Sequence, residues 1–213
     1  MKIVIIGGGS THTPELARGL LERLERIGLR ELWLVDADPA RLDAVGGFVA
    51  RMVEHAGTPF RVRCSTQRKE AMDGADFVIV QIRVGGLAAR REDESLCRRW
   101  RLIDHESTGV GGMASAFRTV PVLLSMAQEM RARCPDAWLI NFSNPLPRIT
   151  RAITKYSGIK SVGKCHQINV AYGIVATLLR EHYGIEIPDD LHMHSDPANA
   201  PTVNQMAAAG REH

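Results

Sequence analysis

Three consecutive glycines near the start of the chain have the residue type and the position to bind the pyrophosphate of a dinucleotide. A run of β-branched residues, 3–6, ends in Gly7, Gly8 and Gly9, and an amphipathic segment follows. This order predicts a strand, a tight turn and the start of a helix whose amides face the anion. Gly7 can take the backbone angles of the turn, and Gly9 places no side chain where a pyrophosphate would approach. The residues predicted to bind the cofactor here are Gly7, Gly9, Ser10 and Thr11.

The glycine pattern is incomplete, because His12 stands where the G-x-G-x-x-G motif has its third glycine. A glycine-rich turn that binds no ligand is therefore the alternative. Asp36 ends the next predicted strand, where a carboxylate can accept hydrogen bonds from the adenosine ribose hydroxyls. A carboxylate there repels a 2′-phosphate, which favours NAD over NADP. The competing interpretation makes Asp36 the N-cap of the helix that begins at Pro39.

Further polar candidates follow two later predicted strands. Arg83 and Arg90 come after the first of these strands, and Asn144 comes after the second. Open α/β sheets bind ligands outside the carboxyl ends of their strands, so these residues are candidates for contact with a substrate or cofactor. A surface salt bridge to Glu92 or Asp93 is the alternative role for Arg90.

Strand and helix patterns alternate along most of the chain and must position these residues. The six strand candidates are 2–6, 31–36, 61–64, 75–82, 137–142 and 160–163. Their alternation with segments of helical spacing predicts an α/β protein with a doubly wound, Rossmann-type parallel sheet. The polar, glycine-rich segment 105–112 is predicted as a loop that either folds over a site or simply connects two helices.

The predicted NAD-binding domain spans 1–185. Residues 186–213 contain three prolines in 188–201 and no clear periodicity, so they are predicted as an irregular tail at the start of a second domain.

Composition excludes several classes of function. The chain has 213 residues, of which 45% are hydrophobic and 24% charged, as in ordinary globular proteins. Its net charge is +3 and acidic residues interleave with the arginines, which argues against a nucleic-acid partner, and the basic run 98–101 is expected on a solvated helix face. Four cysteines without a C-x-x-C pair, the lack of an apolar leader and the lack of an apolar run near ~20 residues lead us to expect a reduced, cytoplasmic protein without a membrane partner.

As a set, these motifs resemble the NAD- and metal-dependent glycosidases of glycoside hydrolase family 4. The resemblance covers about residues 1–180, and its motifs occur in the order that the family shows. They are Ile6 to Ser10 with Thr13 to Glu15, Val35 to Asp38, Gln81 to Arg90, Glu106 to Gly112, Asn141 to Pro145, and Gly163 to His166.

The resemblance implies a hydrolase that works by oxidation and elimination instead of by paired carboxylates. In this family NAD takes hydride from C3 of the sugar, a base removes the C2 proton, the aglycone leaves, water adds and the ketone is reduced again. A divalent metal, Mn²⁺ or another cation, polarises the C2 and C3 oxygens.

The resemblance also implies roles for single residues. Arg83, Arg90 and Glu106 would line the sugar pocket, and Asn144 would bind sugar hydroxyls beside the nicotinamide. Cys165 would ligate the metal as a thiolate, whereas the sequence alone favours a small, inert hydrophobic residue there. The residue after this cysteine varies with the substrate in the family. Here it is His166, which favours an unphosphorylated hexoside or hexuronide such as an α-galactoside, α-glucoside or α-glucuronide.

Two expected parts of the family's machinery do not occur before His213: a His in a Gly-Leu-Asn-His stretch, as second metal ligand, and a catalytic Tyr base. We therefore expect the chain to be the cofactor-binding half of a longer enzyme, with little activity alone. His192, His194 and His213 lack the motif and are expected to be exposed loop residues. Family members associate, so a homo-oligomer is expected.

Two other functions remain open. A 2-hydroxy-acid dehydrogenase of the lactate or malate type shares the glycine turn, the acid that ends the second strand and an Asn-Pro after a later strand. It also needs a His–Asp pair, and the sequence contains no convincing one. A non-catalytic NAD-binding module shares the turn and predicts cofactor binding without turnover.

Overall fold

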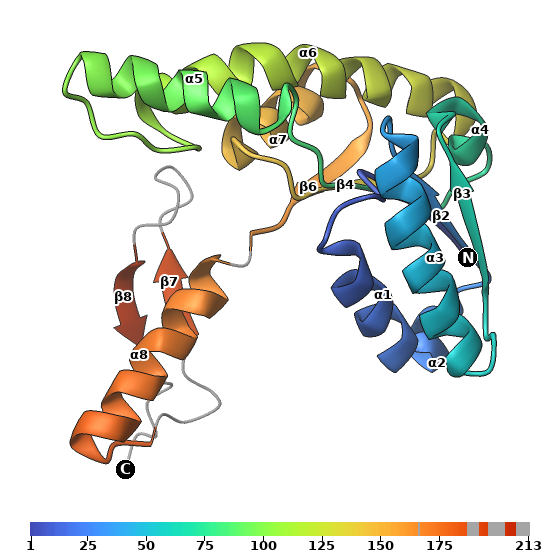
Figure 1. The fold of residues 1–213 in the computed structure, drawn as a ribbon, viewed down its shortest axis with the longest axis horizontal. Helices are drawn as coiled ribbons and strands as arrows, with labels where there is room; N and C mark the ends of the chain where they lie inside the picture. Colours follow the sequence, from blue (N-terminus) through green and yellow to red (C-terminus); the bar gives the residue numbers. More distant parts are fainter. Residues whose placement is uncertain (166, 187–191, 196–202, 208–213) are drawn as a thin grey trace. The chain divides into compact units, whose positions relative to one another are not determined.

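The computed structural model describes residues 1–165, 167–186, 192–195 and 203–207. The chain divides into two compact units, Met1–Gly163 and Lys164–His213. The first unit contains the sheet and the glycine turn, and the second contains a helix and a strand pair (Figure 1).

The first unit is built on a six-stranded parallel sheet in the order β3-β2-β1-β4-β5-β6. The strands are β1 (Lys2–Ile6), β2 (Glu31–Val35), β3 (Arg61–Ser65), β4 (Phe77–Val80), β5 (Trp138–Asn141) and β6 (Lys160–Gly163). The predicted doubly wound fold is confirmed. The chain runs outward from β1 to β3, then returns to the other side of β1 with β4. The carboxyl ends of β1 and β4 therefore flank the switch point at which such sheets bind ligands.

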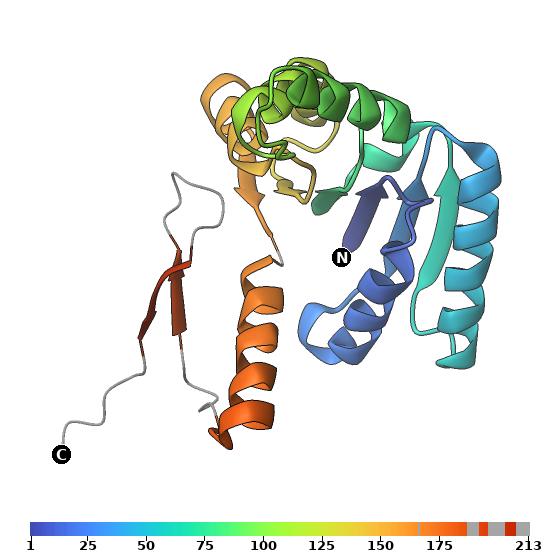
Figure 2. The same cartoon turned by 60° about the vertical axis from the view of Figure 1, so that its left-hand side comes forward.

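Helices cover both faces of the sheet (Figure 1; Figure 2). They are α1 (Thr13–Glu22), α2 (Leu24–Ile27), α3 (Pro39–His55), α4 (Arg68–Met72), α5 (Gly86–Arg99), α6 (Gly109–Arg133) and α7 (Leu146–Tyr156). Side chains of β1 alternate between two cores, as successive strand residues must. Ile3 and Ile5 pack with α1 and α3, whereas Val4 and Ile6 lie in the cluster that contains residues of α4, α6 and α7.

Helix α6 is 25 residues long, and by length and composition it could cross a membrane. Our expectation that no apolar run approaches that length was therefore wrong. The helix nevertheless contributes Leu123, Met126 and Met130 to the core on one face of the sheet. It is apolar because its C-terminal half is a core helix of a doubly wound domain.

The second unit combines a helix with a pair of strands. It contains helix α8 (Gln167–Tyr183) and two antiparallel strands, β7 (His192–Ser195) and β8 (Val203–Ala207). The boundary between the two compact units falls at Gly163, and the domain boundary near 185 stays a prediction. Helical spacing identified α8 as a helix but carries no information about its packing partners. The strand pair depends on pairing between segments, which periodicity in one segment does not reveal.

Candidate functional site

The turn after β1 requires glycine at its first position. Gly7 has φ of +91°, and a Cβ there would lie 2.4 Å from the carbonyl oxygen of Gln81. The amides of Gly7 and Gly8 both donate to the carbonyl oxygen of Val35 at 2.8 Å. The turn is thus held against the ends of β2 and β4, and the prediction of a glycine-dependent turn at Gly7 is confirmed.

Asp36 lies against this turn. Its Oδ2 accepts a hydrogen bond from the amide of Gly9 at 2.9 Å, and a Cβ on Gly9 would lie 2.9 Å from the same oxygen. Glycine at this position therefore lets the backbone approach Asp36, a role that the sequence pattern did not reveal. Asp36 is not the N-cap of α3: that residue is Asp38, whose Oδ1 accepts from the amides of Ala40 and Arg41 at 3.0 and 3.1 Å.

Gln81, at the end of β4, holds the turn from its other side. Its Nε2 donates to the carbonyl oxygen of Gly7 at 3.1 Å and to Oγ1 of the buried Thr13 at 2.8 Å. We did not predict a role for Gln81. The signal was present, because it is a polar residue within an otherwise apolar strand that ends beside the turn.

Two further predicted cofactor residues lie between the turn and α1. Ser10 is half-buried and its Oγ accepts from the amide of His12 at 3.3 Å, whereas Thr11 is exposed. Among the described residues, no side chain caps α1, whose N-cap is His12. The backbone amides that begin this helix therefore lie beside the glycine turn, as expected for a pyrophosphate site.

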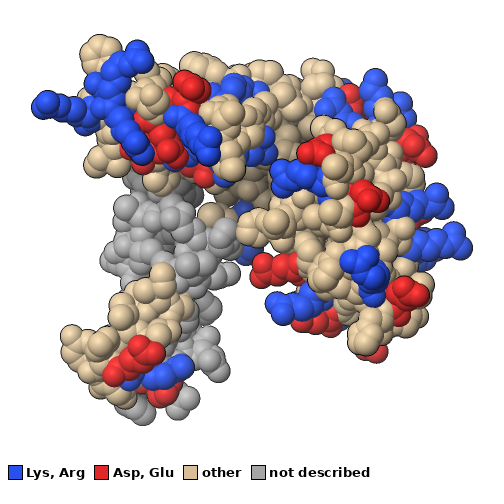
Figure 3. Space-filling model, in the orientation of Figure 1, with Lys and Arg blue, Asp and Glu red and all other residues tan. Residues whose placement is uncertain are grey.

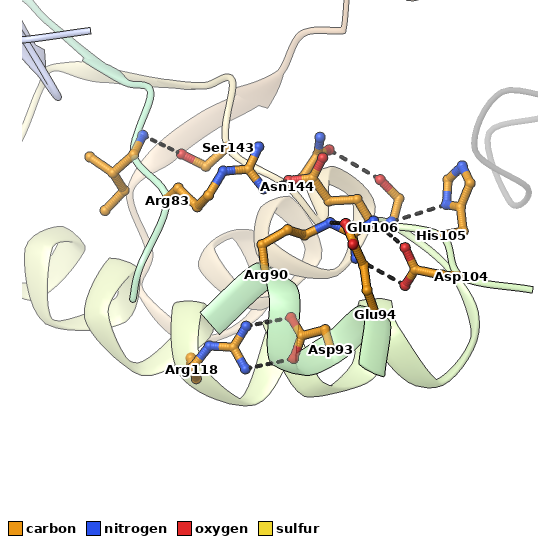
Figure 4. A network of polar contacts seen from close by, with 12 residues as sticks. Arg83, Arg90, Asp93, Glu94, Asp104, His105, Glu106, Arg118, Ser143 and Asn144 are labelled. Carbon is orange, nitrogen blue, oxygen red and sulfur yellow. Dashed lines mark hydrogen bonds and ion pairs between the residues drawn. The ribbon is translucent and has the colours of Figure 1, made fainter. Parts of the chain in front are cut away.

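A second polar cluster lies after β5 (Figure 4). The amide of Ile82 donates to Oγ of Ser143 at 2.9 Å, which joins the segments that follow β4 and β5. Asn141 is fully buried and braces the turn, since its Nδ2 donates to the carbonyl oxygen of Ser143 and its Oδ1 accepts from the amide of Ser143. Asn144 is held next to this turn, and its Oδ1 accepts from Oγ of Ser107 at 3.1 Å.

The segment 105–112 is only partly a loop, which corrects the prediction. Helix α6 begins at Gly109, which has φ of +63°, and Gly111 and Gly112 lie in its first turn. A Cβ on Gly112 would lie 2.6 Å from the carbonyl carbon of Ser107, and one on Gly111 would lie 2.6 Å from Oδ1 of Asp104. These glycines allow the first turn of α6 to pack directly on the preceding chain. Close packing of α6 on the preceding segment, and not loop flexibility, explains why residues 111 and 112 are glycines.

The structure brings Arg83 and Glu106 together as an ion pair, with the Arg83 guanidinium donating to Oε1 of Glu106 (Figure 4). Both side chains are partly exposed, at 43% and 28%. Arg83 follows Ile82, whose amide bonds to Ser143, and Glu106 precedes Ser107, whose Oγ bonds to Asn144. Both side chains therefore come from segments that are hydrogen-bonded to the turn after β5. Three of the predicted sugar-pocket residues thus share one region at the carboxyl edge of the sheet.

Arg90 forms a salt bridge, but not to the predicted partners. Its guanidinium donates to both carboxylate oxygens of Asp104, with an Nη1 to Oδ1 distance of 2.9 Å, and its Nε lies 3.5 Å from Glu94. The hydrogen bond with Asp104 raises the pKa of Arg90 and lowers the pKa of Asp104. The guanidinium is therefore committed to joining α5 to the segment before α6.

A second ion pair joins α5 to α6 directly and was not predicted. Asp93 is 4% exposed and accepts from Nη1 of Arg118 at 2.9 Å. The hydrogen bond with Asp93 raises the pKa of Arg118. Asp93 is the acid that we considered as a partner of Arg90, so the sequence identified a salt-bridge residue but assigned it the wrong arginine.

The predicted metal ligand, Cys165, is exposed and lies in the second unit. His166 lies outside the described residues, as does His213. His192 and His194 are on β7, not in a loop, and their side chains are not described. Within the described part of the chain, no group of three or more His, Cys, Asp or Glu residues could hold a metal ion. These residues alone do not fit a complete metal site.

Comparison with known proteins extends this picture. The model of the family described as "Family 4 glycosyl hydrolase" matches residues 2–181. The chain is 42% identical over 182 residues to the protein named probable 6-phospho-beta-glucosidase of Bacillus subtilis strain 168, which covers 84% of this chain and 41% of that protein. The solved structure of the 6-phospho-beta-glucosidase of Thermotoga maritima with manganese, NAD⁺ and glucose-6-phosphate is 34% identical with a TM-score of 0.78, over 91% of this chain and 46% of that one.

The lactate dehydrogenase of Eimeria maxima, solved with NADH and oxamate, also resembles the chain, with a TM-score of 0.61 over 90% of this chain and 51% of that one. At 17% identity this likeness shows the fold alone. The chain spans about two fifths of the length of the Bacillus subtilis relative. Since the family model matches most of the sequence, and the same motifs lie at the carboxyl edge of the sheet, the chain belongs to glycoside hydrolase family 4.

Proposed function

We propose that this chain is the NAD-binding half of a family 4 glycosidase. The observation that carries the proposal is the pairing of the Gly9 amide with Asp36 beside the glycine turn, at the switch point of the sheet. This is the place where doubly wound domains bind dinucleotides. The relative from Thermotoga maritima was solved with NAD⁺ and shares this fold.

The residues present fit NAD. The pyrophosphate would be held by Gly7, Gly9, Ser10 and Thr11. Asp36 would release the Gly9 amide and accept hydrogen bonds from the adenosine ribose hydroxyls instead. When bound, NAD supplies reversible hydride acceptance, which in this family allows the glycosidic bond to break by elimination after oxidation at C3. The chain's own contribution is to orient the cofactor and the sugar at the carboxyl edge of the sheet.

The sugar would lie near Asn144, Arg83 and Glu106. We propose a 6-phosphoglucoside as the substrate, since the relatives from Bacillus subtilis and Thermotoga maritima are both named for 6-phospho-beta-glucosides. His166 indicates an unphosphorylated sugar instead. We give it less weight, because it is a single residue, whereas the similarity to these relatives extends over most of the chain. Arg83 would supply positive charge to an anionic sugar once its bond to Glu106 opens.

Cys165 is the single candidate ligand that we propose for the divalent metal in this chain. Cys165 would supply a thiolate, and a cation such as Mn²⁺ needs further donors that the described residues do not provide. We therefore expect weak metal binding by this chain, and expect the catalytic base and further ligands to belong to the part of the family's length that this chain does not span.

Titration calorimetry with NAD and NADP tests the proposal. We expect NAD to bind and NADP to bind at least about tenfold more weakly, because a carboxylate at Asp36 repels a 2′-phosphate. Absence of NAD binding would contradict the proposal.

Turnover assays separate the proposal from its rivals. With NAD, Mn²⁺ and a reductant, we expect no turnover of a chromogenic 6-phospho-β-glucoside by the 213-residue chain. Turnover would show that the chain is not an inactive half. Oxidation of lactate or malate with NAD would favour the 2-hydroxy-acid dehydrogenase instead.

A further inference from the structure

Ser107 has all three of its polar groups engaged, although neither the sequence motifs nor the proposed function gives it a role. The residue is 8% exposed. Its amide donates to Nδ1 of His105 at 3.1 Å, its carbonyl oxygen accepts from the guanidinium of Arg148 on α7, and its Oγ donates to Oδ1 of Asn144 at 3.1 Å. A buried serine with partners from three segments is held in one orientation.

The packing around Ser107 restrains it further. The first turn of α6 lies so close that a Cβ on Gly112 would be 2.6 Å from the carbonyl carbon of Ser107. His105 also accepts the amide of Thr108 at 3.2 Å, which fixes the chain that enters α6. The Oγ of Ser107 therefore has a defined position.

This hydrogen bond fixes the position of the Asn144 side chain. The side chain of Asn carries one acceptor oxygen and an NH₂ group with two donors. The oxygen of Asn144 is occupied by Ser107. Within the described part of the chain, no acceptor lies at hydrogen-bond distance from its Nδ2. A serine hydroxyl can hold one end of an amide by donating or accepting, and the other end of the Asn144 amide remains available to a ligand at the carboxyl edge of β5.

The position of Asn144 indicates which part of a dinucleotide it would meet. β5 is two strands from β1, so the segment after β5 lies about 10 Å along the sheet from the glycine turn. An ADP group bound at the turn and at Asp36 would not reach that far along the sheet, whereas the nicotinamide riboside half of NAD would extend in that direction from the switch point.

We propose that Ser107 is a positioning residue that holds the Asn144 side chain toward the nicotinamide riboside half of NAD. The inference rests on the proposed function, because it needs NAD at the glycine turn. Without the Ser107 hydroxyl, the side chain of Asn144 loses the hydrogen bond that holds it at this position.

The experiment compares NAD with ADP, which shares only the half of NAD that the glycine turn and Asp36 would bind. Both are titrated calorimetrically into the full chain and into Ser107→Ala, Ser107→Thr and Asn144→Asp. We expect Ser107→Ala to bind NAD about three- to tenfold more weakly, the loss that one hydrogen bond accounts for. We expect Ser107→Thr, which keeps the hydroxyl, to bind NAD nearly as tightly as the original chain.

Asn144→Asp should lose NAD affinity by at least as much, because a carboxylate has no donors. ADP affinity should be the same in all four proteins, which also shows that each variant is folded. Equal NAD affinity in Ser107→Ala and the original chain would overturn the inference, as would an equal loss of ADP and NAD affinity. If neither ADP nor NAD binds to the original chain, the proposed function itself fails, so the two failures are distinguishable.

Discussion

Asp36 and Asp38 are two residues apart, yet their carboxylates accept hydrogen bonds from different parts of the chain. Asp36 bonds to the amide of Gly9 in the turn, whereas Asp38 caps α3 through the amides of Ala40 and Arg41. The first contact joins segments 27 residues apart, and the second is local. We therefore propose that cofactor binding depends on Asp36 and that the stability of α3 depends on Asp38.

We predict that Asp36→Ala lowers NAD affinity by about tenfold or more, because it removes a charged acceptor for the ribose hydroxyls. The same change should reduce the preference for NAD over NADP. Asp38→Ala is the matched control: it should lower the free energy of unfolding by about 1 kcal/mol through loss of the cap while NAD affinity stays unchanged. Calorimetry and urea unfolding measure the two quantities. A similar loss of NAD affinity in both variants would contradict the assignment.

At the scale of elements, α5 and α6 are joined by charge as well as by apolar contact. Asp93 on α5 is buried and bonds to Arg118 on α6, while Arg90 on α5 bonds to Asp104 just before α6. These pairs hold the segment that carries Glu106 and Ser107 at the carboxyl edge of the sheet. The geometry of the candidate sugar region thus depends on contacts outside it.

We predict that Asp93→Ala lowers the free energy of unfolding by roughly 2 kcal/mol. Breaking a fully buried pair costs about 3–5 kcal/mol, and Arg118, which is 32% exposed, can recover part of this by solvation. Asp73→Ala is the control, since Asp73 is 58% exposed in its pair with Arg133 and its loss should cost about 0.5 kcal/mol or less. Equal destabilisation of the two variants in urea would refute the structural role of Asp93.

The stability of these elements should also depend on acid pH. Hydrogen bonds from Arg90 and Arg68 lower the pKa of Asp104 and Glu129, respectively. A carboxyl group whose pKa is lower in the folded than in the unfolded chain binds more protons when unfolded. Its stabilisation is therefore complete above the unfolded pKa, about 4, and is lost as pH falls through the folded pKa.

We predict that the free energy of unfolding decreases progressively below about pH 4–5, as measured by urea unfolding between pH 3 and 7. Asp104→Asn and Glu129→Gln should each be less stable than the original chain at pH 7 and should lose less stability on acidification. An unchanged slope in the double variant would show that other groups control acid unfolding.

At the scale of the whole molecule, charge is distributed without a large area of one sign on the face shown in Figure 3, where acidic and basic side chains intersperse. Apolar exposure is more localised. On α6, Met113 and Phe117 are 47% and 73% exposed, one helical turn apart on the same side. Exposed apolar residues in such a row favour association between proteins.

We predict that the chain self-associates with increasing concentration and that Phe117→Lys weakens this association. Sedimentation velocity at several concentrations measures it. Phe48→Lys is the control, because Phe48 is also 47% exposed but lies on α3. If both variants associate like the original chain, the α6 surface does not mediate contact between copies.

Local patterns were sufficient for the core of the fold. The apolar runs that became β1, β2 and β4, the glycine turn and the long helices were predictable because each depends on residues close together in sequence. The family could be recognised for the same reason, since its motifs are short segments in a fixed order. Contacts between distant segments could not be predicted in this way. Gly9 bonds to Asp36, which follows β2, and Gln81 bonds to Gly7, which follows β1.

The sequence by itself therefore determined the fold class, the site of the turn and the family. Only the tertiary structure decided which charges and hydrogen bonds pair at the sheet's edge. The alternative considered for Arg90 was a salt bridge to Glu92 or Asp93, but Arg90 bonds to Asp104, 14 residues away, while Ser107 bonds to Asn144 across 37 residues. Which of several nearby acids an arginine meets is set by how α5 and α6 cross, and that crossing is set by packing on the sheet. No periodicity within a single segment carries this information.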